Sequence, residues 1–173
     1  TVNGSYDDVN RLCAMVSQKY KWGFININLR PYYAEGSKTL GYEVAEQLGW
    51  RAPDCVVYPA GSGLSFTRIW KALDELSMLG LIEPANTHMY LTQAAGSSPI
   101  VTAFEAGSLH VNPVEPDTIA TSIAIGNPTD GYYALRIARQ SGGGACAVTD
   151  KEAIAGMKLL AQTEGIFAEA AGG

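Results

Sequence analysis

The sequence predicts an α/β fold, with a mainly parallel sheet and helices on both of its faces. Short apolar runs alternate along the 173 residues with longer segments whose apolar residues repeat at helical spacing. Strands that alternate with helices of this length favour parallel pairing through right-handed crossovers. Residues 55–58 form an apolar run without a polar break. Because such a run is typical of a strand buried on both faces, we expect it to be a central strand of the sheet.

The elements at the start of the chain are predicted from caps and spacing. Ser5 and Asp8 have the spacing of a helix N-terminal cap. Residues 22–28 alternate and are rich in aromatic and β-branched side chains, which predicts a strand. Pro31 restricts Arg30 to extended geometry, so we expect the strand to end there in a turn. A helix should follow, with an apolar stripe made of Leu40, Val44, Ala45 and Leu48.

The remaining elements continue the alternation. After the strand at residues 55–58, helical spacing predicts a helix that buries Phe66, Ile69, Trp70, Leu73 and Leu76. Further strands are expected at residues 89–94 and 145–148, with helices at 98–105 and 130–140 between them. Thr149 and Glu152 form a capping box that should open the last helix. Residues 165–173 are interpreted as a strand entering a turn, so both ends of the chain are interpreted as cut.

Composition and charge narrow the class of protein. The net charge is −5, and the 12 Lys and Arg residues form no basic stripe, which argues against nucleic acid or an anionic membrane as partner. No apolar run reaches the length of a membrane span, so we expect a soluble, cytoplasmic protein. The three cysteines, Cys13, Cys55 and Cys146, are expected to be buried free thiols. His88 and His110 are isolated in the sequence, and no metal site is predicted.

A glycine-containing turn between the strand at 55–58 and the next helix is the candidate binding site. It comprises Gly61, Ser62, Gly63, Leu64 and Ser65. Glycines let main-chain amides approach an anion closely, and a helix N-terminus adds unpaired N–H groups and a positive dipole end. The loop is therefore suited to a phosphate. The alternative is a turn that only joins a strand to a helix and binds nothing.

One longer stretch and several shorter ones together form a recognisable series. The longest is Asn-Leu-Arg-Pro-Tyr-Tyr-Ala-Glu-Gly-Ser-Lys-Thr at residues 28–39. Shorter stretches lie at residues 4–8, 47–50, 53–54, 96–99, 116–120, 124–128 and 163–169. In order and in spacing the series resembles threonine synthases, which are pyridoxal-phosphate enzymes of the tryptophan-synthase-β fold type (fold type II). The single motifs are weak, but the ordered series is specific to this family.

The resemblance implies a two-domain enzyme of which this chain carries a part. Residues 1–28 would end the small domain, and residues 29–173 would form part of the large cofactor-binding domain. The loop of residues 61–65 would hold the phosphate of pyridoxal 5'-phosphate. The family converts O-phosphohomoserine and water to L-threonine and phosphate, so a small-molecule substrate is implied. Members are commonly homodimers.

The resemblance also implies roles for individual residues. The Schiff-base lysine is expected outside this chain, and Lys38 is interpreted as a structural or ion-paired lysine at a helix start. Asn28 and Arg30 resemble a stretch that contacts the substrate's phosphate, since a guanidinium pairs well with phosphate. The alternative for Arg30 is a surface or ion-paired arginine. Glu169 resembles a carboxylate near the cofactor, and a structural role at a strand end is the alternative.

Two other classes of function remain open. One is a different fold-type II enzyme, such as a cysteate synthase or a serine or threonine dehydratase. The other is a non-catalytic phosphate- or nucleotide-binding domain. The loop lacks the third glycine of a dinucleotide fingerprint and the Gly-Lys-Ser/Thr end of a P-loop, which counts against this second class.

Overall fold

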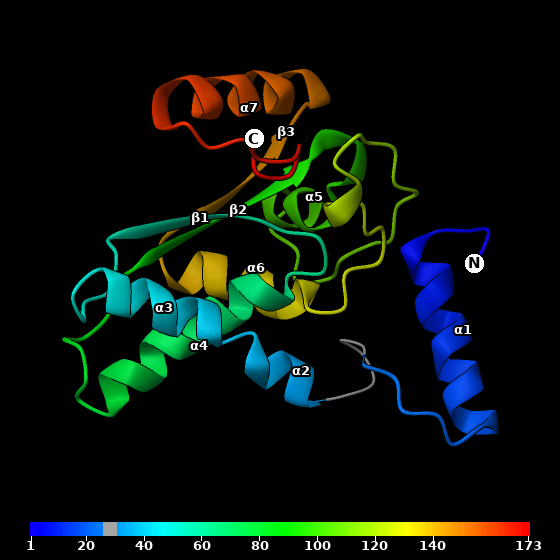
Figure 1. Ribbon diagram of the computed structural model, residues 1–173, viewed down its shortest axis with the longest axis horizontal. Coiled ribbons are helices and arrows are strands. Elements are labelled where there is room, and N and C mark those ends of the chain that lie inside the picture. The colour runs from blue at the N-terminus through cyan, green and yellow to red at the C-terminus, as the bar shows by residue number, and fades with distance from the viewer. Residues whose placement is uncertain (26–30) are drawn as a thin grey trace.

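Three parallel strands form the sheet around which the described residues are arranged (Figure 1). A computed structural model describes residues 1–25 and 31–173 of the chain. The strands are β1 (Cys55–Pro59), β2 (His88–Ala94) and β3 (Gly144–Val148). They lie in the order β1-β2-β3, with Cys55 opposite His88 and Tyr90 opposite Gly144. Both pairs are parallel, which confirms the predicted sheet type.

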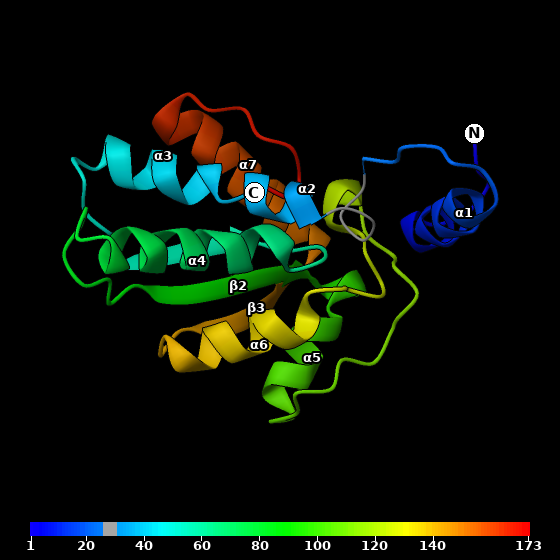
Figure 2. The same cartoon turned by 90° about the horizontal axis from the view of Figure 1, so that it is seen from below.

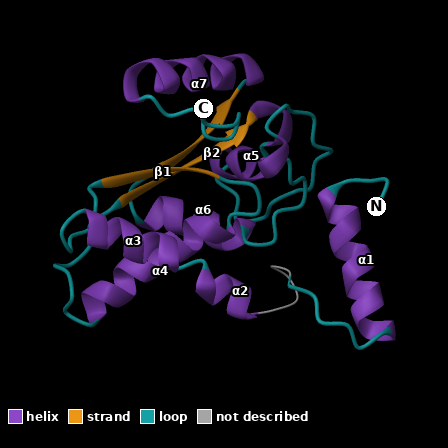
Figure 3. Cartoon of the chain, in the orientation of Figure 1, coloured by secondary structure: helices purple, strands orange, loops and turns teal. Residues whose placement is uncertain are grey.

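Helices connect these strands and cover both faces of the sheet. The α-helices are α1 (Tyr6–Lys19), α2 (Pro31–Gly36), α3 (Thr39–Gln47), α4 (Leu64–Met78), α5 (Pro99–Glu105), α6 (Gly131–Gln140) and α7 (Asp150–Glu164). Two short 3-10 turns, η1 (Ala95–Ser97) and η2 (Thr121–Ile123), lie in the connections. Figure 1 shows α3, α4 and α6 on one side of the sheet and α7 on the other, and Figure 3 shows the same layers by element type. The α/β class with helices on both faces is therefore confirmed.

The core lies between β2 and the helices α4, α5 and α6. Met89 and Leu91 of β2 are almost fully buried, as are Phe66 and Leu73 of α4. This confirms the predicted apolar face of α4. Helix α3 packs closely on α4 at Gly41, where an added Cβ would lie 2.6 Å from the Cβ of Ala72. Close packing of α3 therefore depends on a residue that the apolar pattern did not identify.

The apolar stripe predicted for α3 is only partly correct. Ala45 is fully buried and Val44 half-buried, but Leu40 and Leu48 are 42% and 38% exposed. Gly41 lets the backbones of α3 and α4 approach closely. The helices therefore meet at the small residues Gly41 and Ala72, while Leu40 and Leu48 lie at the edge of the contact.

Capping at the two predicted helix starts is confirmed. The Ser5 hydroxyl accepts a hydrogen bond from the Asp8 amide, and the Asp8 carboxylate accepts one from the Ser5 amide. Thr149 and Glu152 make the same reciprocal pair at the start of α7. Each box satisfies backbone donors that a helix N-terminus leaves without a partner.

The prediction that residues 55–58 form a central strand buried on both sides is wrong. β1 is an edge strand of the sheet in the described part of the chain, and β2 occupies the centre. Val56 and Tyr58 pack against the core, whereas Val57 is 65% exposed. Helices cover one face of β1 only, and apolar composition does not reveal which strands flank a segment.

Two further predicted strands are not found among the residues that the structure describes. Residues 22–25 are not in a strand, and Trp22 and Ile25 are 63% and 89% exposed. An alternating pattern needs a neighbouring strand to form a ladder, and this segment has none among residues 1–25 and 31–173. Its aromatic residues instead contact one another, with Tyr20 stacked on Trp22. Residues 26–28 lie outside the described part. Residues 165–173 likewise form loop and turn rather than strand.

Other predictions for single residues also differ from the structure. Pro31 begins helix α2 where a turn was expected, because proline fits the first position of a helix. Cys55 and Cys146 are exposed, and Cys13 is half-buried, so the expectation of buried thiols is wrong. Cys55 and Cys146 sit on strands whose faces the described helices cover incompletely.

No helix in the described ranges is both long and apolar enough to cross a membrane. Within the same residues, no group of three or more His, Cys, Asp and Glu side chains could hold a metal ion.

Candidate functional site

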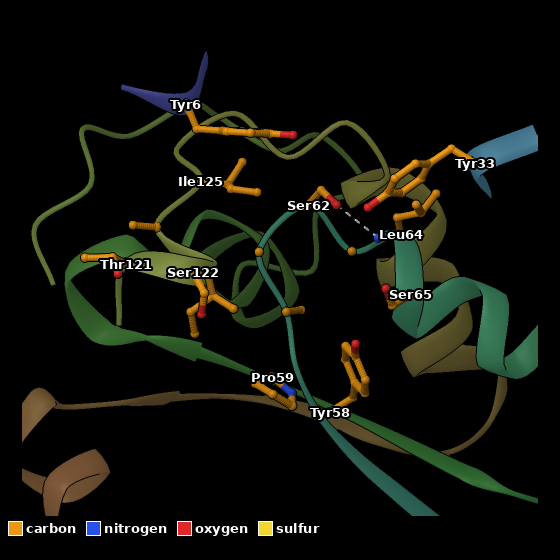
Figure 4. Close-up of a pocket in the computed structure, with 15 residues that line it drawn as sticks. Tyr6, Tyr33, Tyr58, Pro59, Ser62, Leu64, Ser65, Thr121, Ser122 and Ile125 are labelled. Carbon is orange, nitrogen blue, oxygen red and sulfur yellow. Dashed lines mark hydrogen bonds between the residues drawn. The ribbon is translucent and has the colours of Figure 1, made fainter. Parts of the chain in front are cut away.

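The Gly61–Ser65 loop lies where β1 ends and α4 begins, and it forms one wall of a cavity of about 440 Å³. Figure 4 shows the opposite wall, which is the segment around η2, with Tyr6 and Tyr33 at the margins and Tyr58 below. The lining residues are Tyr6, Tyr33, residues 58–65 and residues 121–125. The carboxyl end of a parallel strand is thus brought to a cavity, as expected for an α/β sheet.

Main-chain amides of this loop are the available donors. Ala60 N donates to Thr92 O, Leu64 N to the Ser62 hydroxyl, and Thr67 N to Gly63 O. The amides of Gly61, Ser62, Gly63, Ser65 and Phe66 make no hydrogen bond within the described ranges. They stand at the N-terminus of a 15-residue helix, where the dipole favours an anion. The loop therefore presents a group of donors suited to a phosphate.

Both glycines are needed for the shape of this loop. Gly63 is the N-cap of α4 and has φ +86°, a left-handed conformation that favours glycine. An added Cβ would lie 3.1 Å from the Cβ of Ala134 and 3.3 Å from the carbonyl oxygen of Asp130. At Gly61 an added Cβ would come within 2.9 Å of the Ile125 side chain. A side chain at either position would therefore move the loop away from Ile125 or from Asp130 and Ala134.

The wall opposite the loop is fixed by carboxylates from distant parts of the chain. The Thr118 hydroxyl and the Ile119 amide both donate to the Asp150 carboxylate at the start of α7. The Ser122 hydroxyl donates to Glu169. Glu169 therefore contacts a residue that lines the cavity, while its predicted closeness to a cofactor stays a prediction.

Two more contacts attach the wall at its far end. The Asn127 amide donates to the Asp7 carboxylate of α1 at 3.2 Å, and the Asp130 amide donates to Ser62 O at 3.0 Å. The second bond joins the start of α6 directly to the loop. Burial raises the pKa of the Asp130 carboxyl, and the bond from Thr129 and the charge of Arg68 lower it in part.

An ion-pair cluster lies at the junction of α2, α3 and α4. Lys38 Nζ is 2.8 Å from Glu75 Oε2 and 2.9 Å from Glu35 Oε2, and Lys71 Nζ is 2.8 Å from Glu35 Oε1. Hydrogen bonds from Lys38, then Lys71, lower the pKa of Glu35 to about 2. The same carboxylates raise the pKa of Lys38. The interpretation of Lys38 as an ion-paired lysine at a helix start is confirmed.

The cluster has a consequence for the cavity. Glu35 lies on α2, Lys38 precedes α3, and Glu75 lies on α4, so the three charges hold α2 in place beside α4. Tyr33 of α2 is 42% exposed and lines the cavity next to Ser62 and Leu64 (Figure 4).

Sequence reasoning identified one wall of this cavity and missed the other. Residues 61–65 carry a local glycine signal, whereas residues 121–125, Tyr6 and Tyr33 join them only through the fold. Asn28 and Arg30, predicted to contact substrate, lie outside the described residues.

Comparison with known proteins gives a consistent set of similarities. The sequence model of the family described as pyridoxal-phosphate dependent enzyme matches residues 1–173. Threonine synthase of Methanosarcina acetivorans is 40% identical over 99% of this chain and 42% of its own length. Those of Methanocaldococcus jannaschii and Mycobacterium tuberculosis are 39% and 36% identical over 98% of this chain. The chain spans about 42–45% of these relatives.

Solved structures show the same fold at lower identity. Maize serine racemase has a TM-score of 0.74 at 15% identity, covering 98% of this chain and 47% of its own. Diaminopropionate ammonia lyase from Escherichia coli has a TM-score of 0.73 at 20% identity, covering 99% and 45%. The processed form of threonine deaminase isoform 2 from Solanum lycopersicum has a TM-score of 0.71 at 17% identity, covering 91% and 43%. These neighbours place the chain in the fold-type II architecture.

Proposed function

Because the chain belongs to the family of pyridoxal-phosphate-dependent enzymes, we propose that it is the phosphate-holding part of a threonine synthase. The whole protein would convert O-phosphohomoserine and water to L-threonine and inorganic phosphate, as a carbon-oxygen lyase acting on phosphates. Relatives at 34–40% identity carry this name over nearly the whole chain, which supports the proposal. The racemase and ammonia-lyase structures are at most 21% identical and support the fold alone.

The observation that carries the proposal is the set of amides without partners at the end of β1. We propose that the amides of Gly61, Ser62, Gly63 and Ser65 hold the phosphate of pyridoxal 5'-phosphate. Leu64 would contribute only its main-chain amide, which would exchange its hydrogen bond to the Ser62 hydroxyl for one to the phosphate. When bound, the cofactor would supply a conjugated ring that takes up negative charge from the substrate carbon. The residues present fit this group, since the amides of Gly61, Ser62, Gly63 and Ser65 have no partner within the described ranges and these residues line the cavity.

This chain's side chains would shape the rest of the cavity. The hydroxyl groups of Ser62, Ser65, Thr121 and Ser122 line it and are suited to orient an anion or a water molecule. Tyr6, Tyr33 and Tyr58 also line the cavity. We expect Asn28 and Arg30 to contact the substrate's phosphate. We expect the lysine that joins the cofactor to come from the part of the longer protein that this chain does not cover.

We further infer that residues 1–28 end a smaller domain and residues 29–173 belong to the larger one. Helix α1 supports this division, because it has no buried residue and lies apart from the sheet in both ribbon views (Figures 1 and 2). Its contact with the rest includes the bond from Asn127 to Asp7. Assembly as a homodimer and location in the cytoplasm stay predictions.

The test is a product assay on the full protein that contains this chain. Purified enzyme with pyridoxal phosphate and O-phosphohomoserine should form threonine and inorganic phosphate in equal amounts, measured by chromatography and a phosphate assay. Ammonia and a 2-keto acid from serine or threonine, without threonine synthesis, would instead identify a dehydratase. A protein that binds phosphate but gives no cofactor absorbance would be a non-catalytic domain.

A further inference from the structure

Gln93 is a buried polar residue of the central strand β2, and it does not line the cavity beside the Gly61–Ser65 loop. It is 1% exposed and lies on the same face of β2 as the buried side chains of Met89 and Leu91. Its Nε2 donates to Ala60 O at 3.2 Å, and its Oε1 accepts from the amides of Ile100 and Val101 at 2.9 and 3.2 Å. Burial of an amide is costly unless its groups are hydrogen-bonded, and here both ends have partners.

One of these partners belongs to the approach to the phosphate loop. Ala60 directly precedes Gly61, and its carbonyl shares a peptide plane with the Gly61 amide. The described backbone has no cis peptide bond. In a trans peptide the C=O and N–H groups point in opposite directions. Because Gln93 holds the Ala60 carbonyl toward the core, the Gly61 N–H is turned the other way, to the side of the cavity it lines.

The peptide two residues later is held in the same manner. Ser62 O accepts from the Asp130 amide at 3.0 Å, which fixes the peptide that carries the Gly63 N–H. Thus two alternate peptides of the loop are held by their carbonyls, one by a backbone amide and the other by the side chain of Gln93. Of these two hydrogen bonds, only the one from Gln93 to the Ala60 carbonyl depends on a side chain and can be removed by substitution.

We propose that Gln93 is a positioning residue for phosphate binding, acting through the Ala60–Gly61 peptide. The proposal rests on the proposed function, because it assumes that the Gly61 amide binds phosphate. An anion on the Gly61 N–H polarises the peptide and strengthens the acceptor on Ala60, so the two hydrogen bonds support one another. Gln93 itself does not touch the ligand, and the two bonds from α5 keep its side chain in place.

The experiment compares Gln93→Met with the unmodified chain, using inorganic phosphate as probe and ³¹P NMR titration as readout. Methionine has a similar length and packs well in a core but donates no hydrogen bond. We expect phosphate affinity to fall about tenfold, the size of effect that loss of one hydrogen bond produces. Ser141→Ala is the matched control, because Ser141 is buried and binds the Met89 amide at the other end of β2. It should reduce stability and leave phosphate affinity unchanged.

A second measurement needs no substitution and applies even where the Gln93 variant does not fold. In the unmodified chain, phosphate should shift the NMR signals of the Gly61 amide and the Gln93 side-chain amide together, while exposed Gln162 stays unchanged. Phosphate binding that Gln93→Met retains in full, or a Gln93 signal that ignores phosphate, would overturn the role of Gln93 alone. Failure of the unmodified chain to bind phosphate would overturn this role and the proposed function together.

Discussion

Lys38 and Glu75 lie 2.8 Å apart across the boundary between α3 and α4, and the same ammonium reaches Glu35 of α2 at 2.9 Å. One cation therefore joins three helices. Only 14% of the Lys38 side chain is exposed, so its charge is compensated mainly by these two carboxylates and less by water.

Replacing Lys38 with methionine should destabilise the fold and loosen α2. The substitution removes the cation that lies between Glu35 and Glu75 and leaves both carboxylates charged, and removal of one partner from such a pair is usually unfavourable. We expect a lower midpoint of urea unfolding, followed by circular dichroism. Lys151→Met on the exposed face of α7 is the control and should change the midpoint little.

Stability should fall in acid through the same cluster. The folded-state pKa of Glu35 is lowered from 4.5 to about 2, and that of Glu75 is also lowered, chiefly by hydrogen bonds from Lys38. A lowered folded pKa means stability that is complete above the unfolded pKa and lost as pH falls toward the folded value. The loss should therefore occur between about pH 4.5 and pH 2.

Glu75→Gln is the variant that isolates this effect. It should unfold at a lower urea concentration than the unmodified chain at pH 6, and the difference should shrink at pH 3, where unfolding of both forms is measured in parallel. A difference that stays constant between these two pH values would show that the charge of Glu75 contributes nothing to stability.

Gly63→Ala should cost more than the same substitution at Gly80. Both glycines have positive φ, +86° and +69°, and a non-glycine residue there costs about 1–2 kcal/mol. Gly80 has open space around its Cβ position, whereas at Gly63 the new methyl group would meet Ala134 at 3.1 Å. Urea unfolding should reveal the larger loss at Gly63, and phosphate titration should show weaker binding in this variant alone. Equal losses would mean that the contact with α6 relaxes freely.

Thr149→Ala should lower the free energy of unfolding by about 1 kcal/mol, because an N-cap hydroxyl satisfies a backbone donor at the start of α7. Thr149→Ser keeps the hydroxyl and serves as the control. Chemical unfolding of the three proteins at neutral pH measures the effect. Loss of stability in the serine variant equal to that of alanine would argue against the hydrogen bond as its source.

Features that depend on a few consecutive residues could be predicted from the sequence. The caps at Ser5 and Thr149 and the glycine turn after β1 are of this kind, because their geometry is decided within one helical turn. Features that depend on distant neighbours could not. Residues 22–25 alternate like a strand, but whether they pair depends on a segment elsewhere.

The burial of a single strand also depends on distant neighbours and could not be predicted from the sequence. The apolar run at β1 is equally compatible with a central and an edge position, and the order of strands decides between them. Gln93 is a further case, since nothing in the sequence around this glutamine indicates its partner Ala60, 33 residues earlier. The loop that forms one wall of the cavity could therefore be located by sequence, but the contacts that support it could not.

The walls of the cavity come from residues 58–65 and 121–125, with Tyr6 and Tyr33 from two further helices. Because the ligand would contact all of these segments, its binding would be linked to their folding. A phosphate ligand at 100 times its Kd would stabilise the folded chain by about 2.7 kcal/mol, and hydrogen exchange would slow in every contributing segment at once. A bound ligand would thus connect the segments that line the cavity, which are far apart in the sequence.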